Sequence, residues 1–323
     1  LAALGSGLAR AGVRDLALFR QLGVVVGVLP PPFLAPLPIV ALLHALAALD
    51  IPDKALLPPL LRAASLLPPP VVSPQAAANL AWSLAVLVHA PQVRPSHLFA
   101  VLGLLVPNRP RFSPLHQRQV HQFLLTCHLL NLRISAPRNG EPSRHEATPP
   151  SGAREAMLDD AGYDCFSGTP LAALARECHE AFTNGSLHEA APSRLQQEVA
   201  VGVRTLLARS GGTREWHIEE EAIHEESGYS LDLALLDADR QVCIEVDGPS
   251  HFVARGRRPL GSTLLKHRHL QAMGWTVISV PFWEWQAVAG RPRPPAGATP
   301  AAAGRVEGAH RAWTLLPGEA VEP

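Results

Sequence analysis

Two acidic side chains late in the chain have a spacing that suits metal-dependent chemistry. Glu245 and Asp247 lie at the end of the run VCIEVD, in which valine and isoleucine alternate with other residues. A period of two indicates a β-strand, so both carboxylates should project from the same face. Carboxylates arranged in this way can hold a divalent cation such as Mg²⁺, which activates water and stabilises the charge that develops during phosphodiester cleavage.

A third carboxylate should lie opposite the first of these two. Asp232 belongs to the preceding apolar stretch, and the turn-forming sequence DADR separates the two stretches at 237–240. A hairpin centred on this turn pairs Leu236 with Gln241. The same register places Asp232 directly opposite Glu245, where Cβ atoms are about 5 Å apart.

Two like charges at that distance destabilise the fold unless something relieves their repulsion. A metal ion bound by Asp232 and Glu245 would do so. A basic side chain would also do so, and the candidates are Lys266, Arg268 and His251. Alternatively, one carboxyl group could be protonated. The sequence leaves these three alternatives open.

A basic loop follows the acidic strand and predicts a surface for single-stranded RNA. The segment HFVARGRR at 251–258 combines three arginines, for phosphate contacts, with an aromatic ring, for base stacking. A solvated loop without a ligand is the alternative. We expect the first histidine of this segment to form a hydrogen bond near the carboxylates and orient the loop. The predicted RNA-binding residues are His251, Phe252, Arg255, Arg257, Arg258, Lys266 and Arg268.

The elements that would position these side chains can also be read from the sequence. The strand at 242–246 is stopped by Gly248 and Pro249, and a helix runs from Gly261 to a C-capping Gly274. A second strand follows at 275–280. Upstream, the same patterns predict helices at 170–182 and 193–207 and strands at 216–222 and 229–236, with Ser193 and Gln196 as a capping box for the second helix.

The segments IEVDGPSHF, LLKHRHL, GWTVISVP and WEW closely resemble the RAP domain, a C-terminal module of organellar proteins that act on RNA. The resemblance covers 194–286. It implies RNA binding and an αβββαβ core related to the PD-(D/E)xK nuclease fold. The nuclease motif has a lysine two residues after its glutamate, where this chain has Asp247, and Lys266 is the candidate substitute. We therefore expect a binding domain. The alternative is a Mg²⁺-dependent endoribonuclease with Asp232, Glu245, Asp247 and Lys266 as catalytic residues.

The N-terminal part of the chain predicts an α-helical solenoid. Residues 1–130 are rich in leucine and alanine, and helical patterns begin at Pro38, Pro74 and Pro114. Pro36, Pro74 and Pro114 are spaced at intervals of about 40 residues. The stretch SPQAAANLAWSLAVL resembles the first helix of an octotricopeptide repeat, a family that binds RNA. A helical bundle with accidental spacing is the alternative. Within this stretch we expect Trp82 to be a core residue.

Composition sets further bounds on the chain. It has 323 residues, with 28 basic and 28 acidic side chains, so any nucleic-acid surface must be a local patch. The four cysteines form no CxxC pair, so a zinc site is not indicated. Prolines interrupt the longest apolar stretch, so a membrane span is not indicated either.

The first residue is Leu1, which suggests a fragment. We expect helical repeats at 1–134, a disordered linker at 135–165, the RAP domain with preceding helices at 166–290, and a mobile low-complexity tail at 291–323.

The resemblance to the RAP domain implies an RNA-binding protein of chloroplasts or mitochondria. Its expected partners are single-stranded organellar transcripts, whose processing, stability or translation it would affect. Binding of this kind needs no cofactor, whereas the endoribonuclease alternative would need Mg²⁺. A scaffold that contacts other proteins is the second alternative.

Overall fold

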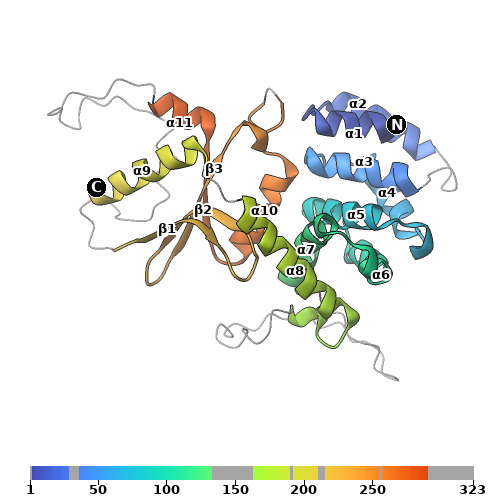
Figure 1. Cartoon of the computed structure of the whole chain (residues 1–323). Coiled ribbons are helices and arrows are strands. Elements are labelled where there is room, and N and C mark those ends of the chain that lie inside the picture. Colours follow the sequence, from blue (N-terminus) through green and yellow to red (C-terminus); the bar gives the residue numbers. More distant parts are fainter. Residues whose placement is uncertain are drawn as a thin grey trace, which may run out of the picture. The chain divides into compact units, whose positions relative to one another are not determined.

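A computed structural model describes residues 2–28, 36–132, 163–189, 192–209, 215–254 and 256–289 of the chain. These residues form two compact units, which are taken separately below (Figure 1). The first unit contains the described parts of Leu1–Glu189 together with His224–Tyr229 and Val253–His269. The second contains those of Ala190–Ile223, Ser230–Phe252 and Leu270–Pro323.

The first unit consists of helices in two rows. Helices α1, α3, α5 and α7 pack against one another in succession, and α2, α4 and α6 form the second row beside them (Figure 1). Helix α8 packs against α7. The helices are α1 (Ala2–Arg10), α2 (Leu16–Val28), α3 (Pro36–Ala48), α4 (Leu57–Ser65), α5 (Pro74–Leu87), α6 (Pro95–Asn108), α7 (Pro114–Leu129) and α8 (Pro170–Glu189).

Two successive helices of the first row, α5 and α7, begin at prolines, as the sequence predicts. Pro74 and Pro114 are the first residues of α5 and α7, where a missing N–H group leaves no hydrogen bond unmade. Ser73 and Ser113 precede them, and each serine Oγ accepts a hydrogen bond from a backbone N–H of the first turn. The starts of successive helices in this row are therefore fixed locally.

Helix α5 forms the centre of the first unit. All of its residues from the third onward are buried except Asn79, because other helices cover it on several sides. Small alanine side chains allow this close approach. Trp82 is 8% exposed, and its ring lies 5.0 Å from that of His44 on α3. The prediction that Trp82 is a core residue is confirmed.

The second unit contains a four-stranded mixed sheet in the order β1-β2-β3-β4. The first three strands are antiparallel and β4 is parallel to β3. The elements are α9 (Arg194–Arg209), β1 (His217–Ile223), β2 (Ser230–Leu236), β3 (Gln241–Asp247), β4 (Thr276–Pro281) and α11 (Phe282–Ala289). Helix α10 (Gly261–Ala272) connects β3 to β4, and its residues up to His269 belong to the first unit.

One face of the sheet packs against α9 and α11 to form the core of the second unit. Gly202 on α9 makes this possible, because a Cβ there would lie 2.6 Å from the Trp285 ring of α11. The apolar residues of the strands alternate toward this face, as period-two patterning requires. The core contains Val199, Ala200, Val203, Leu233, Leu235, Val242, Ile244, Val246, Ile278 and Val280.

The structure confirms an N-terminal helical region followed by an α/β region with the predicted order of helix, three strands, helix and strand. The predicted strands agree with the observed ones to within one residue at each end. Helix α8 runs seven residues beyond its predicted end at 182. Most of the predicted linker at 135–165 and the whole predicted tail at 291–323 lie outside the described residues. Among the helices that the structure describes, none combines the length and apolar character needed to cross a membrane.

Candidate carboxylate cluster and nucleic-acid interface

The hairpin of β2 and β3 has the register that the sequence predicts. Leu236 pairs with Gln241, and the ladder continues to Leu233 opposite Ile244. The next step of this register brings Asp232 to the level of Glu245. The three predicted carboxylates thus lie on two neighbouring strands of the second unit, at the end where β3 runs into the loop after Asp247.

The carboxylate of Asp232 accepts hydrogen bonds at both of its oxygens. Gln196 on α9 donates from Nε2 to Oδ1 at 2.8 Å, and the backbone N–H of Val246 donates to Oδ2 at 2.6 Å. The same Gln196 Nε2 donates to Oε1 of Glu221 on β1 at 3.2 Å. The Gln196 amide therefore donates to two carboxylates, Asp232 and Glu221. The backbone of the neighbouring strand β3 gives Asp232 its second hydrogen bond.

Glu245 and Asp247 are both buried, at 3% and 1% exposure. The Cys243 thiol donates to Oε1 of Glu245 at 3.1 Å, and the Ser279 hydroxyl donates to Oδ2 of Asp247. His251 lies with Nδ1 2.9 Å from the other Asp247 oxygen, Oδ1. Buried carboxylates need such donors, because an unpaired charge away from water is strongly unfavourable.

These contacts bear on the three alternatives for relieving the charge repulsion. Of the predicted basic partners, His251 is found beside a carboxylate, Asp247. Each oxygen of Asp232 accepts one hydrogen bond from the protein and has a second lone pair, so these contacts do not decide between a metal ion and hydrogen-bond donors. Among the residues that the structure describes, no three or more His, Cys, Asp or Glu side chains are grouped to hold a metal. The catalytic and metal-binding roles assigned to these carboxylates and Lys266 stay predictions.

The predicted basic loop divides into residues with different surroundings. Arg257 and Arg258 are both exposed, and Arg258 donates from Nη2 to Oδ2 of Asp50 at 2.7 Å in the first unit. Asp50 follows α3 and is 3% exposed. Nearby, the N–H of Ala254 donates to the backbone oxygen of Gly12 at 2.8 Å. Arg255 lies outside the described residues. The loop is therefore attached to the helical rows, and one of its arginines takes part in that attachment.

Arg268 on α10 also contacts the helical rows. Its guanidinium donates to the backbone oxygen of Val86 at 2.6 Å and to Nδ1 of His89 at 2.9 Å. Burial lowers the pKa of Arg268, even though the charge of Asp50 acts in the opposite direction. His89 in turn lies with Nε2 3.3 Å from the Asp50 carboxylate. Arg268 and Arg258 thus converge on one buried acidic residue of the first unit.

The predicted stacking ring, Phe252, is buried at 6% exposure in the second unit. It packs edge-on against Trp283, with ring centroids 4.4 Å apart, and beside Phe282. The neighbouring His251 side chain is 42% exposed. A base could stack on Phe252 only after its aromatic neighbours moved. The RNA-binding roles of the seven predicted residues stay predictions.

Sequence reasoning missed the importance of Asp50. Arg258 and His89 contact its carboxylate, and Arg14 donates to its backbone oxygen. Its φ of 48° is in the left-handed region. Aspartate is among the few residues that adopt this conformation readily. An isolated acidic residue directly after an apolar Leu/Ala helix was the only sequence signal for it.

A second missed feature is a buried polar network around α7. His121 donates from Nε2 to the backbone oxygen of Ser227 at 2.7 Å, and its Nδ1 lies 3.3 Å from the Tyr163 hydroxyl. His269 on α10 similarly has Nε2 at 2.8 Å from the Thr126 hydroxyl and Nδ1 at 3.0 Å from the Tyr229 hydroxyl. Burial lowers the pKa of both His121 and His269 to about 3. Both rings are therefore neutral at physiological pH and join segments that are distant in the sequence.

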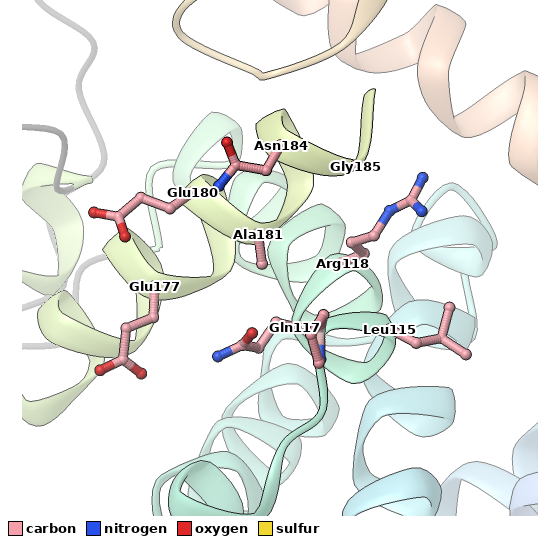
Figure 2. A pocket seen from close by; sticks show the side chains of 9 residues that line it. Leu115, Gln117, Arg118, Glu177, Glu180, Ala181, Asn184 and Gly185 are labelled. Atoms are coloured by element: carbon pink, nitrogen blue, oxygen red, sulfur yellow. The ribbon is translucent and has the colours of Figure 1, made fainter. Parts of the chain in front are cut away.

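An open groove of about 520 Å³ lies between α7 and α8 in the first unit (Figure 2). Arg118 and Gln117 line it from α7, and Glu177 and Glu180 line it from α8. Its charges are mixed, and Glu177 already pairs with Arg109, which lowers the pKa of that carboxyl group. None of the sequence-predicted site residues lines this groove.

Comparison with known proteins places one family in the C-terminal part of the chain. Residues 244–292 match the model of the RAP domain. A protein of Oryza sativa subsp. japonica named RAP domain-containing protein, chloroplastic, is 36% identical over 98 residues, which is 30% of this chain and 13% of that protein. The human FAST kinase domain-containing protein 3, mitochondrial, is 29% identical over 111 residues, or 31% of this chain and 16% of that protein. Its Bos taurus counterpart is 29% identical over 75 residues. The matched part of the chain thus spans less than a fifth of each of the first two relatives.

Proposed function

We propose that this chain, which carries a RAP domain, binds single-stranded RNA in an organelle and acts there on the processing, stability or translation of particular transcripts. The single observation that carries the proposal is the family match over 244–292. The names of the relatives, one chloroplastic and two mitochondrial, support an organellar location.

The two structural parts would contribute to this function in different ways. In our proposal, the rows of helices in the first unit are octotricopeptide-like repeats and supply an extended binding surface, as repeat proteins commonly do. Their regular proline-initiated helices support that assignment. The sheet of the second unit would be a nuclease-like scaffold. Its αβββαβ order and its acidic residues at the end of β3 support this relationship.

RNA binding is tested with the full chain and a pool of single-stranded RNA, with duplex DNA of equal length as competitor. We expect saturable binding to the single strand that weakens linearly on a logarithmic scale as salt rises, because phosphate contacts release counterions. No binding to any RNA at low salt would overturn the proposal. A protein-binding scaffold would then be the better assignment.

The endoribonuclease alternative is tested in the same mixtures by adding Mg²⁺ or Mn²⁺. We expect no cleavage and no rise in melting temperature, because Asp247 stands where the nuclease motif has its lysine, two residues after Glu245. The alternative gains if cleavage requires the metal and disappears in both Asp232→Asn and Glu245→Gln.

A further inference from the structure

Three cations recur at the same place in three successive turns of the helical rows. Arg14 lies two residues before α2, Lys54 lies three residues before α4, and Arg94 directly precedes α6. Each is 40 residues from the next, so the cations follow the interval of the helical pattern. Lys54 and Arg94 are exposed, and Arg14 is partly buried. We call these three residues the turn cations.

The helical part of the chain has a surplus of positive charge, although the whole chain is neutral. Residues 1–132 contain nine arginine or lysine residues, three aspartates and no glutamate, against 19 basic and 25 acidic residues in the rest. Asp15 and Asp53 accept hydrogen bonds from backbone N–H groups at the starts of α2 and α4. Asp50 is buried and paired with Arg258. The three carboxylates of this part are therefore engaged within the protein, and the surplus suits a polyanion.

A segment of the matched RAP region contacts the same three turns in order. Residues 253–269 belong to the first unit, and each turn shares one hydrogen bond with them. The pairs are Ala254 with Gly12, Arg258 with Asp50, and Arg268 with His89. Arg14 also joins the first turn to the second, since its Nε donates to the backbone oxygen of Leu49 at 3.2 Å. These contacts tie the turns together, so the separation of the turn cations is set before any ligand binds.

We propose that the turn cations bind the phosphate groups of a single-stranded RNA along this edge of the helical rows, with one contact from each helix pair. Helical-repeat proteins that bind single-stranded RNA take one base per repeat. A cation that recurs once per helix pair matches the regular charge of such a strand. Phosphate contacts fix the register of the strand and act alike on every sequence. This assignment rests on the proposed RNA binding and gives it a surface.

The test measures binding of the full chain to a pool of single-stranded RNA by fluorescence anisotropy at several salt concentrations. Lys54→Gln combined with Arg94→Gln removes two of the three contacts at exposed positions. Each phosphate contact on a single strand contributes about 0.7 to the slope of log affinity against log salt, so the slope should become shallower by about 1.4. The affinity at 0.1 M salt should fall about 25-fold for the same reason. Each single substitution should change the slope by about 0.7, which keeps the test valid if the pair reduces stability.

Arg62→Gln combined with Arg111→Gln is the matched control. Both arginines are exposed, but Arg62 is in the last turn of α4 and Arg111 follows α6. They thus lie toward the opposite ends of the helices that Lys54 and Arg94 precede. The control loses the same charge and should keep the slope and affinity of the wild type. Lys54→Arg combined with Arg94→Lys, which keeps both charges, should keep them as well.

The assignment is overturned if Lys54→Gln with Arg94→Gln leaves the salt slope unchanged. It is also overturned if the control makes the slope shallower by the same amount, because net charge alone would then explain the loss. Either result leaves RNA binding itself standing. Failure of the wild-type chain to bind any RNA of the pool at low salt removes the proposed function as well.

Discussion

At the scale of single residues, Gln196 connects local and long-range structure. Its Oε1 accepts from the backbone N–H of Ser193 and so completes the capping box of α9, while its Nε2 reaches Asp232 and Glu221. The first contact follows from sequence spacing alone. The second depends on a strand that lies 36 residues farther along the chain.

We expect Gln196→Ala to lower the free energy of unfolding by about 2 kcal/mol, since it removes a helix cap and a hydrogen bond to a carboxylate. Chemical denaturation of the full chain measures this change. Gln197→Ala is the control, because that neighbouring side chain makes one exposed contact to a backbone oxygen, at 3.4 Å. Equal effects of the two substitutions would show that the contact to Asp232 contributes nothing.

The residue-scale geometry was only partly predictable. Period-two alternation and the DADR turn were enough to predict that Leu236 pairs with Gln241, because hairpin register depends on local turn length. The partners of the carboxylates were not predictable in the same way. Gln196 and Ser279 come from separate elements, and only the packed fold brings them to Asp232 and Asp247.

At the scale of elements, the segment Val253–His269 is the least predictable part of the fold. Its sequence predicts a basic loop and a helix, which the structure contains. Its contacts, however, are with helices about 200 residues earlier in the chain: Arg258 reaches Asp50 across 208 positions. The only indication in the sequence was the positive charge of this segment. Positive charge can bind either the phosphates of RNA or a buried carboxylate.

Two neighbouring arginines separate these uses of charge. Arg258→Ala should lower the free energy of unfolding by about 1 kcal/mol, because it leaves the buried Asp50 carboxylate short of a donor. The Arg258 side chain is 48% exposed, so solvent screening reduces the loss below that of a fully buried pair. Arg257→Ala should weaken RNA binding with a flatter salt dependence.

Thermal and chemical unfolding, together with RNA titrations at several salt concentrations, measure both effects. The outcome that contradicts the assignment is a stable Arg258→Ala variant with weakened RNA binding. In that case the contact between Arg258 and Asp50 would contribute little to stability, and the whole loop would bind RNA, as the sequence predicts.

At the scale of the whole molecule, the repeating helices of the first unit could be predicted, whereas the distant segments that belong to the same unit could not. The helical rows were predictable because α3, α5 and α7 each begin at a proline and the apolar pattern repeats at a regular interval. The first unit also contains His224–Tyr229 and part of α10. The periodicity of the sequence does not predict that these two segments belong with the helical rows. Buried histidines hold these distant segments together: His121 bonds to Ser227, and His269 bonds to Thr126.

These two histidines make the stability of the chain depend on pH in a defined direction. Burial lowers the pKa of each from 6.5 to about 3, so between these values the unfolded chain takes up protons that the folded chain does not. Stability is therefore highest above pH 6.5 and falls as the pH drops toward 3, by about 1.4 kcal/mol per pH unit for each histidine. Denaturant titrations at pH 7 and pH 5 should show a clear loss of folding stability at the lower pH.

His121→Gln, whose amide can still donate to Ser227, should reduce the slope of stability against pH by about the contribution of one histidine. A slope that is the same in the wild type and in His121→Gln would mean that His121 does not hold its segment by a neutral, buried contact.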